Sequence, residues 1–467
     1  MLDLFLTGFV GLILLMGLRK PFIWVLAFLY VDIVAPQKIS YALLTNVQLS
    51  LVVFFLAVVG WLFFDNKQGA RVSGRQILML LLLVYCYFTT QSADFPVEAA
   101  DKWSWVWKSL VWAMFLPLAL RTQLRIEAAA LVMVLSASAL IIDGALKTLA
   151  GGGGYGTLKL FINDNNGLYE GSTISCVAIA IIPLALWLAK DGTIFPANSR
   201  TRLFAYGLAF AGLLIPIGTE ARTGLVCAAL LAVLMMRAVK YRWLYAGALA
   251  LAALLVQPLL PNSFSNRMGT IQNNQSDQSA ATRLAVWKWT LGYVAEHPFG
   301  GGFDAFRGNK LEIVTSGDDG FGSNSTKIID QGRAYHSAYF EMLGEQGWPG
   351  LALWLTLQIS GLIQLEGVRR RLRKSQAPSD RRYADLALAL QQGHFVYLLG
   401  AGFVGIAFQP FVYMLIALQI ALVQQVRRKT APVAVTQRRM QVPGVKDAQD
   451  TAPPTTGLTT GTPAPAN

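Results

Sequence analysis

Three side chains in the second half of the chain are of types that bind anions and accept protons. Arg222 follows a short polar turn and opens an apolar run, so it would add a full cation to the free N–H groups at a helix start. Arg283 directly precedes an amphipathic stretch over residues 284–294 and repeats this arrangement. His336 precedes a third apolar run, and an imidazole with a free pKa of about 6.5 suits general-base work at neutral pH. The three residues predict an anion site beside a proton acceptor.

Each of these residues also has an ordinary structural explanation. Arg222 could be an interfacial arginine whose side chain reaches out to the membrane surface, or it could pair with Glu220. Arg283 could be a solvated loop residue. His336 could be a capped or hydrogen-bonded residue at the membrane edge. The residue types alone leave both interpretations open for all three positions.

Helical geometry relates His336 to a glycine further along the chain. Gly347 follows after close to three helical turns, so the two residues share one face if a helix runs between them. Glu341 and Glu345 then fall largely on the opposite side. The secondary site candidates are the tyrosine before the histidine, this glycine and an asparagine in an Asn-rich loop: Tyr335, Gly347 and Asn165.

The composition shows what kind of scaffold must position these side chains. The chain has 467 residues, of which 54% are hydrophobic and only 14% are charged, against roughly 25% charged in a soluble domain. Its mean hydropathy of +0.46 leaves too little polar surface to cover a water-soluble globule. A soluble enzyme, a disordered scaffold and a secreted disulfide protein are therefore excluded, and a polytopic membrane protein remains. The three cysteines fall inside apolar runs, as packing residues do.

The charge excess follows the membrane pattern and does not indicate nucleic-acid binding. Lysine and arginine number 39 against 26 acidic residues, a net charge of +13. Most of the basic residues stand in short clusters between apolar runs, which is the distribution that marks the cytoplasmic ends of membrane spans. The clusters are Lys67, Arg71 and Arg75; Arg121 and Arg125; Lys190, Arg200 and Arg202; Arg237, Lys240 and Arg242; Arg369, Arg370, Arg371, Arg373 and Lys374; and Arg427, Arg428 and Lys429.

The apolar runs predict an all-α polytopic membrane protein with twelve or thirteen transmembrane helices. A bilayer core needs about 20 mostly apolar residues per helix. The run at 22–36 is short and could be re-entrant. The candidate spans are 2–18, 22–36, 46–64, 76–93, 104–120, 126–143, 172–189, 203–219, 223–240, 243–260, 347–365, 389–407 and 410–426.

The spans divide the chain into four predicted parts. A transmembrane bundle over 1–260 is followed by a large, mainly helical periplasmic loop domain over 261–346 and by further transmembrane helices over 347–429. Loops of that length are uncommon unless they are functional or disordered, and this one carries apolar residues in a helical pattern. The Thr-, Pro- and Ala-rich tail over 430–467 is predicted to be a disordered cytoplasmic segment.

We expect neither a metal ion nor a cofactor. The chain contains no Asp-x-Asp pair, and its three histidines lie too far apart in sequence for a zinc motif. Arg222 and Arg283 could supply the charge that Mg²⁺ supplies in many phosphate-handling enzymes, because guanidinium binds phosphate oxygens bidentately.

Three segments resemble the O-antigen ligase and polymerase superfamily of membrane glycosyltransferases, and together they cover about residues 200–365. One departure is Ala221, since the family's ligases often carry serine before the first arginine. The Leu18–Phe22 and Asn163–Gly167 stretches also resemble the exosortase-associated O-glycosylation ligase branch. The three main segments are Gly218–Leu225, Thr282–Gly302 and His336–Gly350.

The resemblance implies transfer of a finished glycan (O-antigen) from undecaprenyl pyrophosphate to lipid A-core at the periplasmic face of the bacterial inner membrane. Arg222 and Arg283 would clamp the pyrophosphate, and His336 would activate the acceptor hydroxyl. A single displacement would invert the anomeric centre without a metal ion. Membrane lipids surround the protein, and no nucleic acid is involved.

Three alternatives stay open. Two share the donor: an O-antigen polymerase, and a protein O-oligosaccharyltransferase whose acceptor is a Ser or Thr hydroxyl. The more remote alternative is a secondary transporter, which predicts several ionisable residues inside the spans. The sequence offers few, chiefly Asp32 and Lys108 near the ends or faces of predicted spans.

Overall fold

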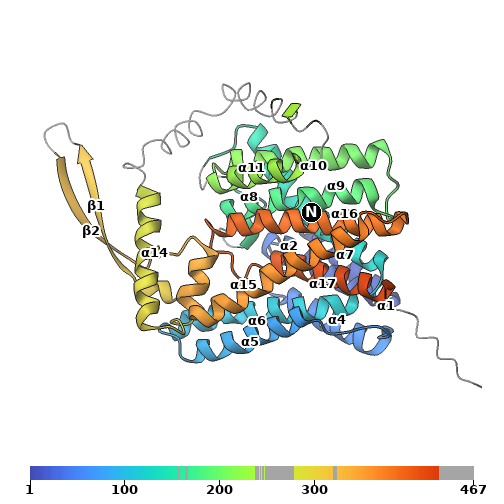
Figure 1. The fold of residues 1–467 in the computed structure, drawn as a ribbon, viewed down its shortest axis with the longest axis horizontal. Helices are drawn as coiled ribbons and strands as arrows, with labels where there is room; N and C mark the ends of the chain where they lie inside the picture. The colour runs from blue at the N-terminus through green and yellow to red at the C-terminus, as the bar shows by residue number, and fades with distance from the viewer. Residues whose placement is uncertain are drawn as a thin grey trace, which may run out of the picture. The chain divides into compact units, whose positions relative to one another are not determined.

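The structure is a computed structural model that describes residues 1–154, 158–162, 167–236, 241, 243–244, 247, 278–318 and 323–430. Helices make up nearly all of this part of the chain, with a single two-stranded sheet beside them (Figure 1). The elements are α1 (Leu2–Arg19), α2 (Phe22–Val34), α3 (Pro36–Ile39), α4 (Leu49–Phe64), α5 (Gly74–Gln91), α6 (Pro96–Ala119), α7 (Gln123–Leu149), η1 (Gly167–Tyr169), α8 (Gly171–Ala180), α9 (Ile182–Asp191), α10 (Ser199–Gly218), α11 (Arg222–Met236), α14 (Gln278–Glu296), η3 (Ala305–Gly308), β1 (Lys310–Asp318), β2 (Ser323–Gln331), α15 (Ala338–Leu372), α16 (Pro378–Ala401) and α17 (Pro410–Thr430).

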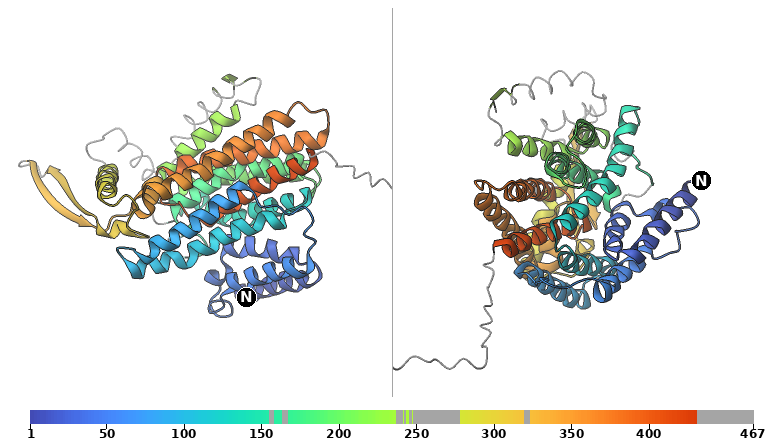
Figure 2. Two further views of the ribbon diagram at one scale, coloured as in Figure 1. Left: turned by 60° about the horizontal axis from the view of Figure 1, so that its bottom comes forward. Right: turned by 90° about the vertical axis from the view of Figure 1, so that its right-hand side faces the viewer.

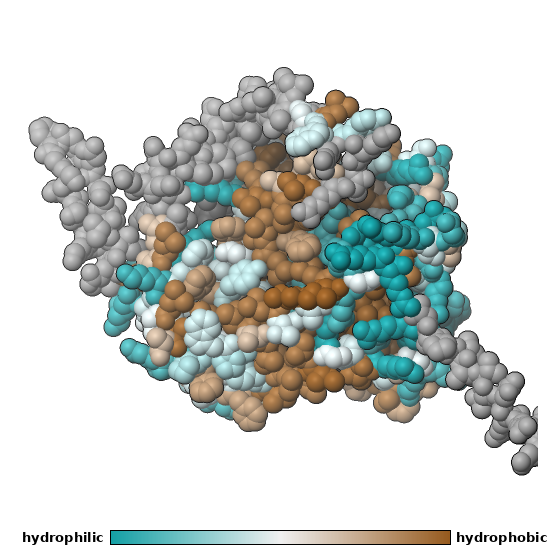
Figure 3. All heavy atoms as spheres, in the orientation of Figure 1, coloured by the Kyte–Doolittle hydropathy of each residue, from teal (hydrophilic) through white to brown (hydrophobic). Residues whose placement is uncertain are grey.

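The fold class is confirmed as an all-α polytopic membrane protein. Each predicted span overlaps a helix of the structure, with 172–189 divided between α8 and α9 and 389–407 running past the end of α16; the span 243–260 lies almost wholly outside the described residues. Among the described helices, six are long and apolar enough to cross a membrane by length and composition, and α2, α4 and α11 are shorter apolar helices. In Figure 3 apolar residues form a band across the middle of the visible face, with hydrophilic residues gathered most densely at its right-hand end.

Polar residues set the helix starts where the chain enters the bundle. The Ser73 side chain accepts a hydrogen bond from the Gln76 N–H, and the Gln76 side chain accepts one from the Ser73 N–H, which is a full capping box. Thr122 and Asn198 cap α7 and α10 with side-chain oxygens in the same way. These caps satisfy backbone donors that the first helical turn leaves unpaired.

One charge lies deeper in the bundle than the sequence indicated. Arg75 was predicted to belong to a cytoplasmic cluster at a span end, but its side chain is 1% exposed and donates to Gln419 Oε1 at 3.0 Å. The side chain fits beside Gly361, where a Cβ would lie 2.3 Å from a guanidinium nitrogen. His394, fully buried, bonds Gln419 and Gln358 at 3.0 and 2.8 Å. Among the described residues, Gln419 is thus the hydrogen-bond partner of Arg75 Nη2, while Nε and Nη1 are buried without a partner.

The segment between α14 and α15 contains strands that the sequence did not indicate. β1 and β2 pair antiparallel in register from Lys310 with Gln331 to Asp318 with Ser323, and the hairpin extends away from the helices in Figures 1 and 2. Helix α14 begins at Gln278, so Arg283 lies inside it and not directly before it as predicted. The reason is that Ser279 to Thr282 continue the helical hydrogen bonding of the stretch they precede.

Helix α15 is broken at Gly347, where the sequence predicts a regular helix. Gly347 has φ +61°, and Pro349 has no N–H to donate to the Glu345 carbonyl. The glycine loop after α14 satisfies the freed groups: Gly302 N–H donates to the Glu345 carbonyl at 2.9 Å, and Gly301 N–H donates to the Gly344 carbonyl at 3.0 Å. Two glycines of the Gly300–Gly302 loop therefore donate to the carbonyls that the helix break leaves without a helical partner.

The predicted common helical face of His336 and Gly347 is wrong. Ser337 is the residue before the first turn of α15, His336 has φ +49°, and Gly347 stands at the break. The two residues are therefore not on one continuous helix, because the chain turns at both positions.

We predict that Gly347→Ala destabilises the protein strongly. A Cβ at this position would lie 2.2 Å from the Pro298 carbonyl oxygen, and the left-handed backbone alone costs about 1–3 kcal/mol for a non-glycine residue. The measurement is the thermal unfolding midpoint of the purified protein in detergent. Gly367→Ala is the control, because it is exposed in the same helix and meets no atom within 4 Å. Equal midpoints for the two variants would contradict the assigned role of the break.

Candidate active site

A cavity of about 1090 Å³ opens where several helix ends meet. Its wall comes from α2, α6, the start of α8, the turn around η3, the start of α15 and the loop between α16 and α17. The charged or titratable lining residues are Asp32, Lys38, Glu98, Asp101, Lys102, Glu170, Asp304, Arg307, Tyr169, Tyr335, His336, Glu341 and Glu345.

His336 is presented to this cavity by a strained backbone. Its φ of +49° is a conformation that L-residues rarely adopt, and its side chain is exposed while Tyr335 and Ser337 on either side are buried. Tyr335 packs edge-on against Phe306, with ring centroids 5.7 Å apart. The buried neighbours on both sides fix the histidine at the cavity wall.

Helix α14 is attached directly to the histidine segment. Trp287 Nε1 donates to the Tyr335 carbonyl oxygen at 2.9 Å, and its ring stacks on Phe340 at a centroid distance of 4.9 Å. Arg283 lies four residues before Trp287, so the two project from the same face of α14. Burial lowers the pKa of the His336 imidazole, and the positive charge of Arg283 lowers it further. Arg283 therefore lies within electrostatic reach of His336, although it is not among the residues that line the cavity.

The pKa of His336 lies below its ordinary value. Partial removal from water by the surrounding protein lowers it first, and the charge of Arg283 lowers it further, while Glu170 acts in the opposite direction and Arg333 in the same. A lowered pKa leaves the imidazole neutral at pH 7. A neutral imidazole can accept a proton from a hydroxyl.

Arg222 opens α11 after a very tight turn, as predicted. Helix α10 ends at Gly218, and the turn residues Thr219, Glu220 and Ala221 are buried, with φ +50° at Glu220. The Thr219 hydroxyl lies 2.8 Å from that of Ser175, so the turn packs on α8.

Helix α8 connects this turn to the cavity. Its preceding residue Glu170 accepts hydrogen bonds from the Ser172 and Thr173 N–H groups and lines the cavity together with His336. Arg222 itself does not belong to the cavity lining. Arg222 is thus related to the cavity indirectly: the turn before it packs on α8, and the first turn of α8 lines the cavity.

The secondary candidates fall in different places. Tyr335 lines the cavity with its ring buried against the wall. Gly347 lies at the break of α15 and outside the lining. Asn165 lies outside the described residues.

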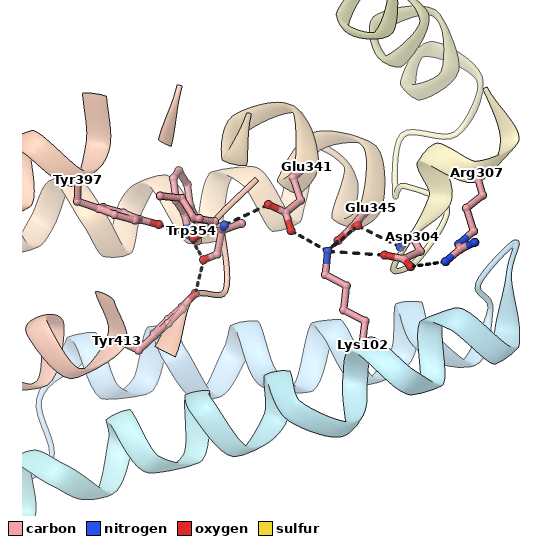
Figure 4. A network of polar contacts seen from close by, with 10 residues as sticks. Lys102, Asp304, Arg307, Glu341, Glu345, Trp354, Tyr397 and Tyr413 are labelled. Carbon is pink, nitrogen blue, oxygen red and sulfur yellow. Dashed lines mark hydrogen bonds and ion pairs between the residues drawn. The ribbon is translucent and has the colours of Figure 1, made fainter. Parts of the chain in front are cut away.

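An ionic cluster beside the histidine went unrecognised in the sequence. Lys102 Nζ lies 2.7 Å from Glu341 Oε1, 2.8 Å and 3.0 Å from the two Glu345 oxygens, and 3.9 Å from Asp304 Oδ1 (Figure 4). Glu345 is fully buried and Glu341 is 6% exposed. The prediction that these glutamates point away from His336 is wrong, because the histidine precedes the helix and all three line one cavity. Two glutamates at i, i+4 in an apolar run were the available signal.

Backbone groups complete the cluster. Asp304 N–H donates to Glu345 Oε1 at 3.0 Å, and Ala407 N–H donates to Glu341 Oε2 at 3.1 Å. The Ala407 carbonyl in turn accepts from Trp354 Nε1 at 3.1 Å and from the Tyr413 hydroxyl at 3.2 Å (Figure 4). Within the described residues, no three His, Cys, Asp or Glu side chains are placed to share a metal ion, and an ammonium stands between these carboxylates instead.

The structure is that of a helical multi-pass membrane protein. One cavity in it is lined by a histidine and by an ionic cluster. Residues 207–355 match the O-antigen ligase family (Wzy_C), and residues 1–193 match a family of unknown function (DUF5935). This O-antigen ligase domain supports membership of the O-antigen ligase superfamily and confirms the resemblance seen in the sequence. No curated protein matches the chain.

The cavity lies between the two matched regions. Residues from α2, α6 and the start of α8 belong to the N-terminal match, whereas residues 304–345 belong to the O-antigen ligase match. The remaining wall, over residues 403–411, lies beyond both. The chamber is therefore a joint product of the two regions.

We predict that the reactivity of His336 reports its lowered pKa. Diethyl pyrocarbonate modifies neutral imidazole, so modification of His336 in the purified protein should be half-maximal below pH 6.5, as followed by peptide mass spectrometry. Arg283→Gln should shift this midpoint upward, because it removes a positive charge that opposes protonation. Glu170→Gln should shift it downward. Midpoints that stay fixed in both variants would show that the two charges do not act on the histidine.

Proposed function

We propose that this protein transfers a glycan from undecaprenyl pyrophosphate to an acceptor hydroxyl at the periplasmic face of the bacterial inner membrane. The observation that carries the proposal is His336, exposed at the wall of a large cavity within electrostatic reach of Arg283. Membership of the O-antigen ligase superfamily supports glycosyl transfer as the reaction class.

The proposed reaction is a single displacement. The neutral imidazole of His336 takes the proton of the acceptor hydroxyl while that oxygen forms a bond to the anomeric carbon of the donor sugar. The bond from this carbon to the pyrophosphate oxygen breaks, and the electron pair stays on the leaving pyrophosphate. Attack from the opposite face inverts the anomeric centre. The donor carries the driving force, so no nucleotide is consumed.

Arg222 and Arg283 would stabilise the charge that grows on the leaving group. Guanidinium groups bind phosphate oxygens bidentately, and donors already in place cost no reorganisation during the reaction. Arg222 adds the free N–H groups of α11 to its own charge, since it is the first residue of that helix. Glu170 supports the step in another way, because its negative charge stabilises the imidazolium that forms on His336.

Lipid A-core is the acceptor that the superfamily resemblance implies, which would make the protein an O-antigen ligase in lipopolysaccharide assembly. A protein Ser or Thr hydroxyl is the alternative acceptor, because the donor and the proposed chemistry at His336 would be the same.

We predict that Arg222→Ala, Arg283→Ala and His336→Ala each reduce transfer by about 10²–10³-fold or more, the usual effect of removing one transition-state donor. Transfer is measured with purified protein in liposomes containing a lipid-linked glycan. Lys288→Ala is the control, because it removes an exposed cation from the same helix as Arg283. Wild-type rates in all three site variants would refute the assignment.

A second experiment identifies the acceptor. The same liposomes receive either purified lipid A-core or a Ser/Thr-containing peptide, each with and without EDTA. We expect EDTA to leave the rate unchanged, since arginines are proposed to replace the metal charge. Product on the peptide alone would establish the oligosaccharyltransferase, and product on lipid A-core alone would establish the ligase. A rate abolished by EDTA and restored by Mg²⁺ would contradict the arginine clamp.

A further inference from the structure

Lys102 joins parts of the chain that lie far apart in sequence. Its ammonium comes from α6, in the region that matches a family of unknown function, and contacts Glu341 and Glu345 in the first two turns of α15. Through Glu345 it reaches the turn at Asp304, and through Glu341 it reaches the loop at Ala407. Four segments therefore meet at one cation whose side chain is 13% exposed (Figure 4).

The same four segments form part of the cavity wall that His336 lines. The histidine lies two residues before α15, Arg307 follows Asp304 in the adjoining turn, and residues 403–411 contribute a mostly apolar part of the lining. Arg307 also lies 3.4 Å from Asp304 and 3.8 Å from Glu98 of α6, which adds a second ionic link between the two regions. A displacement at Lys102 would thus move the residues that frame the imidazole.

The charges explain why the cation is required there. Glu341, Glu345 and Asp304 place three carboxylates around one ammonium, and Glu345 has no exposed surface. Without the lysine these carboxylates would repel one another in a water-poor environment. Glu345 has no exposed surface, so it acts through the Lys102 ammonium and the Asp304 N–H that it contacts.

We propose that Lys102 is a positioning residue for glycan transfer, through which the N-terminal region holds His336 and the surrounding wall in their reactive arrangement. The rate effect rests on the proposed transferase function. The arrangement of the wall can be tested without any substrate. The N-terminal region is thereby assigned a role in the reaction chamber in addition to spanning the membrane.

The kinetic test compares Lys102→Met with Lys102→Arg and with the control Lys108→Met, six residues along the same helix and outside the cavity lining. For Lys102→Met we expect kcat to fall about 10²-fold, as small misplacements of reacting groups do, with an unchanged KM for the donor. Lys102→Arg should recover most of kcat because it keeps the charge. Wild-type kcat in Lys102→Met would overturn the proposal.

The double variant Lys102→Met/Glu345→Gln separates positioning from stability. Removing one carboxylate relieves the repulsion, so the thermal unfolding midpoint should return toward that of the wild type. The bridge between α6 and α15 remains absent, so kcat should stay low. A kcat that recovers in parallel with the midpoint would show a merely structural role and overturn the proposal, even if Lys102→Met alone fails to fold.

The substrate-free test uses Ala334→Cys, an exposed position on the cavity wall two residues before His336. The native cysteines are all buried, so background labelling by a charged maleimide should be low. We expect Lys102→Met/Glu345→Gln to change the labelling rate of this cysteine severalfold, and Lys108→Met to leave it unchanged. Equal rates would overturn the positioning role. A wild-type chain that transfers no glycan, with the labelling difference present, would reject the transferase proposal alone.

Discussion

The pairing of one largely buried ammonium with two buried carboxylates is the constraint on which, we propose, the site depends. Charges removed from water must be compensated locally, and Lys102 has its partners only if α6, α15 and the turn at Asp304 converge. The convergence places the segment before α15 at the cavity and leaves His336 exposed between two buried residues. The ionic cluster adds a charge requirement to the packing of these elements.

A second constraint acts on the backbone at the same place. The break at Gly347 and the missing donor of Pro349 free two carbonyls inside a buried region, where unpaired polar groups are costly. The glycine loop after α14 satisfies both, and its lack of side chains allows the close approach. Because α14 also carries Arg283 and contacts the Tyr335 carbonyl through Trp287, this loop fixes the arginine helix against the histidine segment. Backbone pairing and charge pairing therefore converge on one short part of α15.

Much of this arrangement could be predicted from local sequence. Apolar run lengths located the spans, and the short polar turn before Arg222 correctly marked a helix start. The start of α14 was missed because Ser279 to Thr282 carry no hydrophobic periodicity, and the hairpin because its strands lack alternating apolar residues. The pairing of Lys102 with Glu345 joins residues 243 positions apart, which no local pattern encodes. The left-handed backbone at His336 arises from burial of its neighbours, so the sequence wrongly suggested a helical face shared with Gly347.

The shared chamber has a consequence for how such proteins can be recombined. Residues 1–193 and 207–355 match different families, which would ordinarily mark two exchangeable modules. Here the lysine belongs to one and its glutamates to the other, so neither half carries a balanced set of charges by itself. Consider a hybrid that joins residues 1–193 of one homologue to residues 207–355 of another. Its cavity keeps the ionic cluster only if the lysine from the first region and the glutamates from the second are both present.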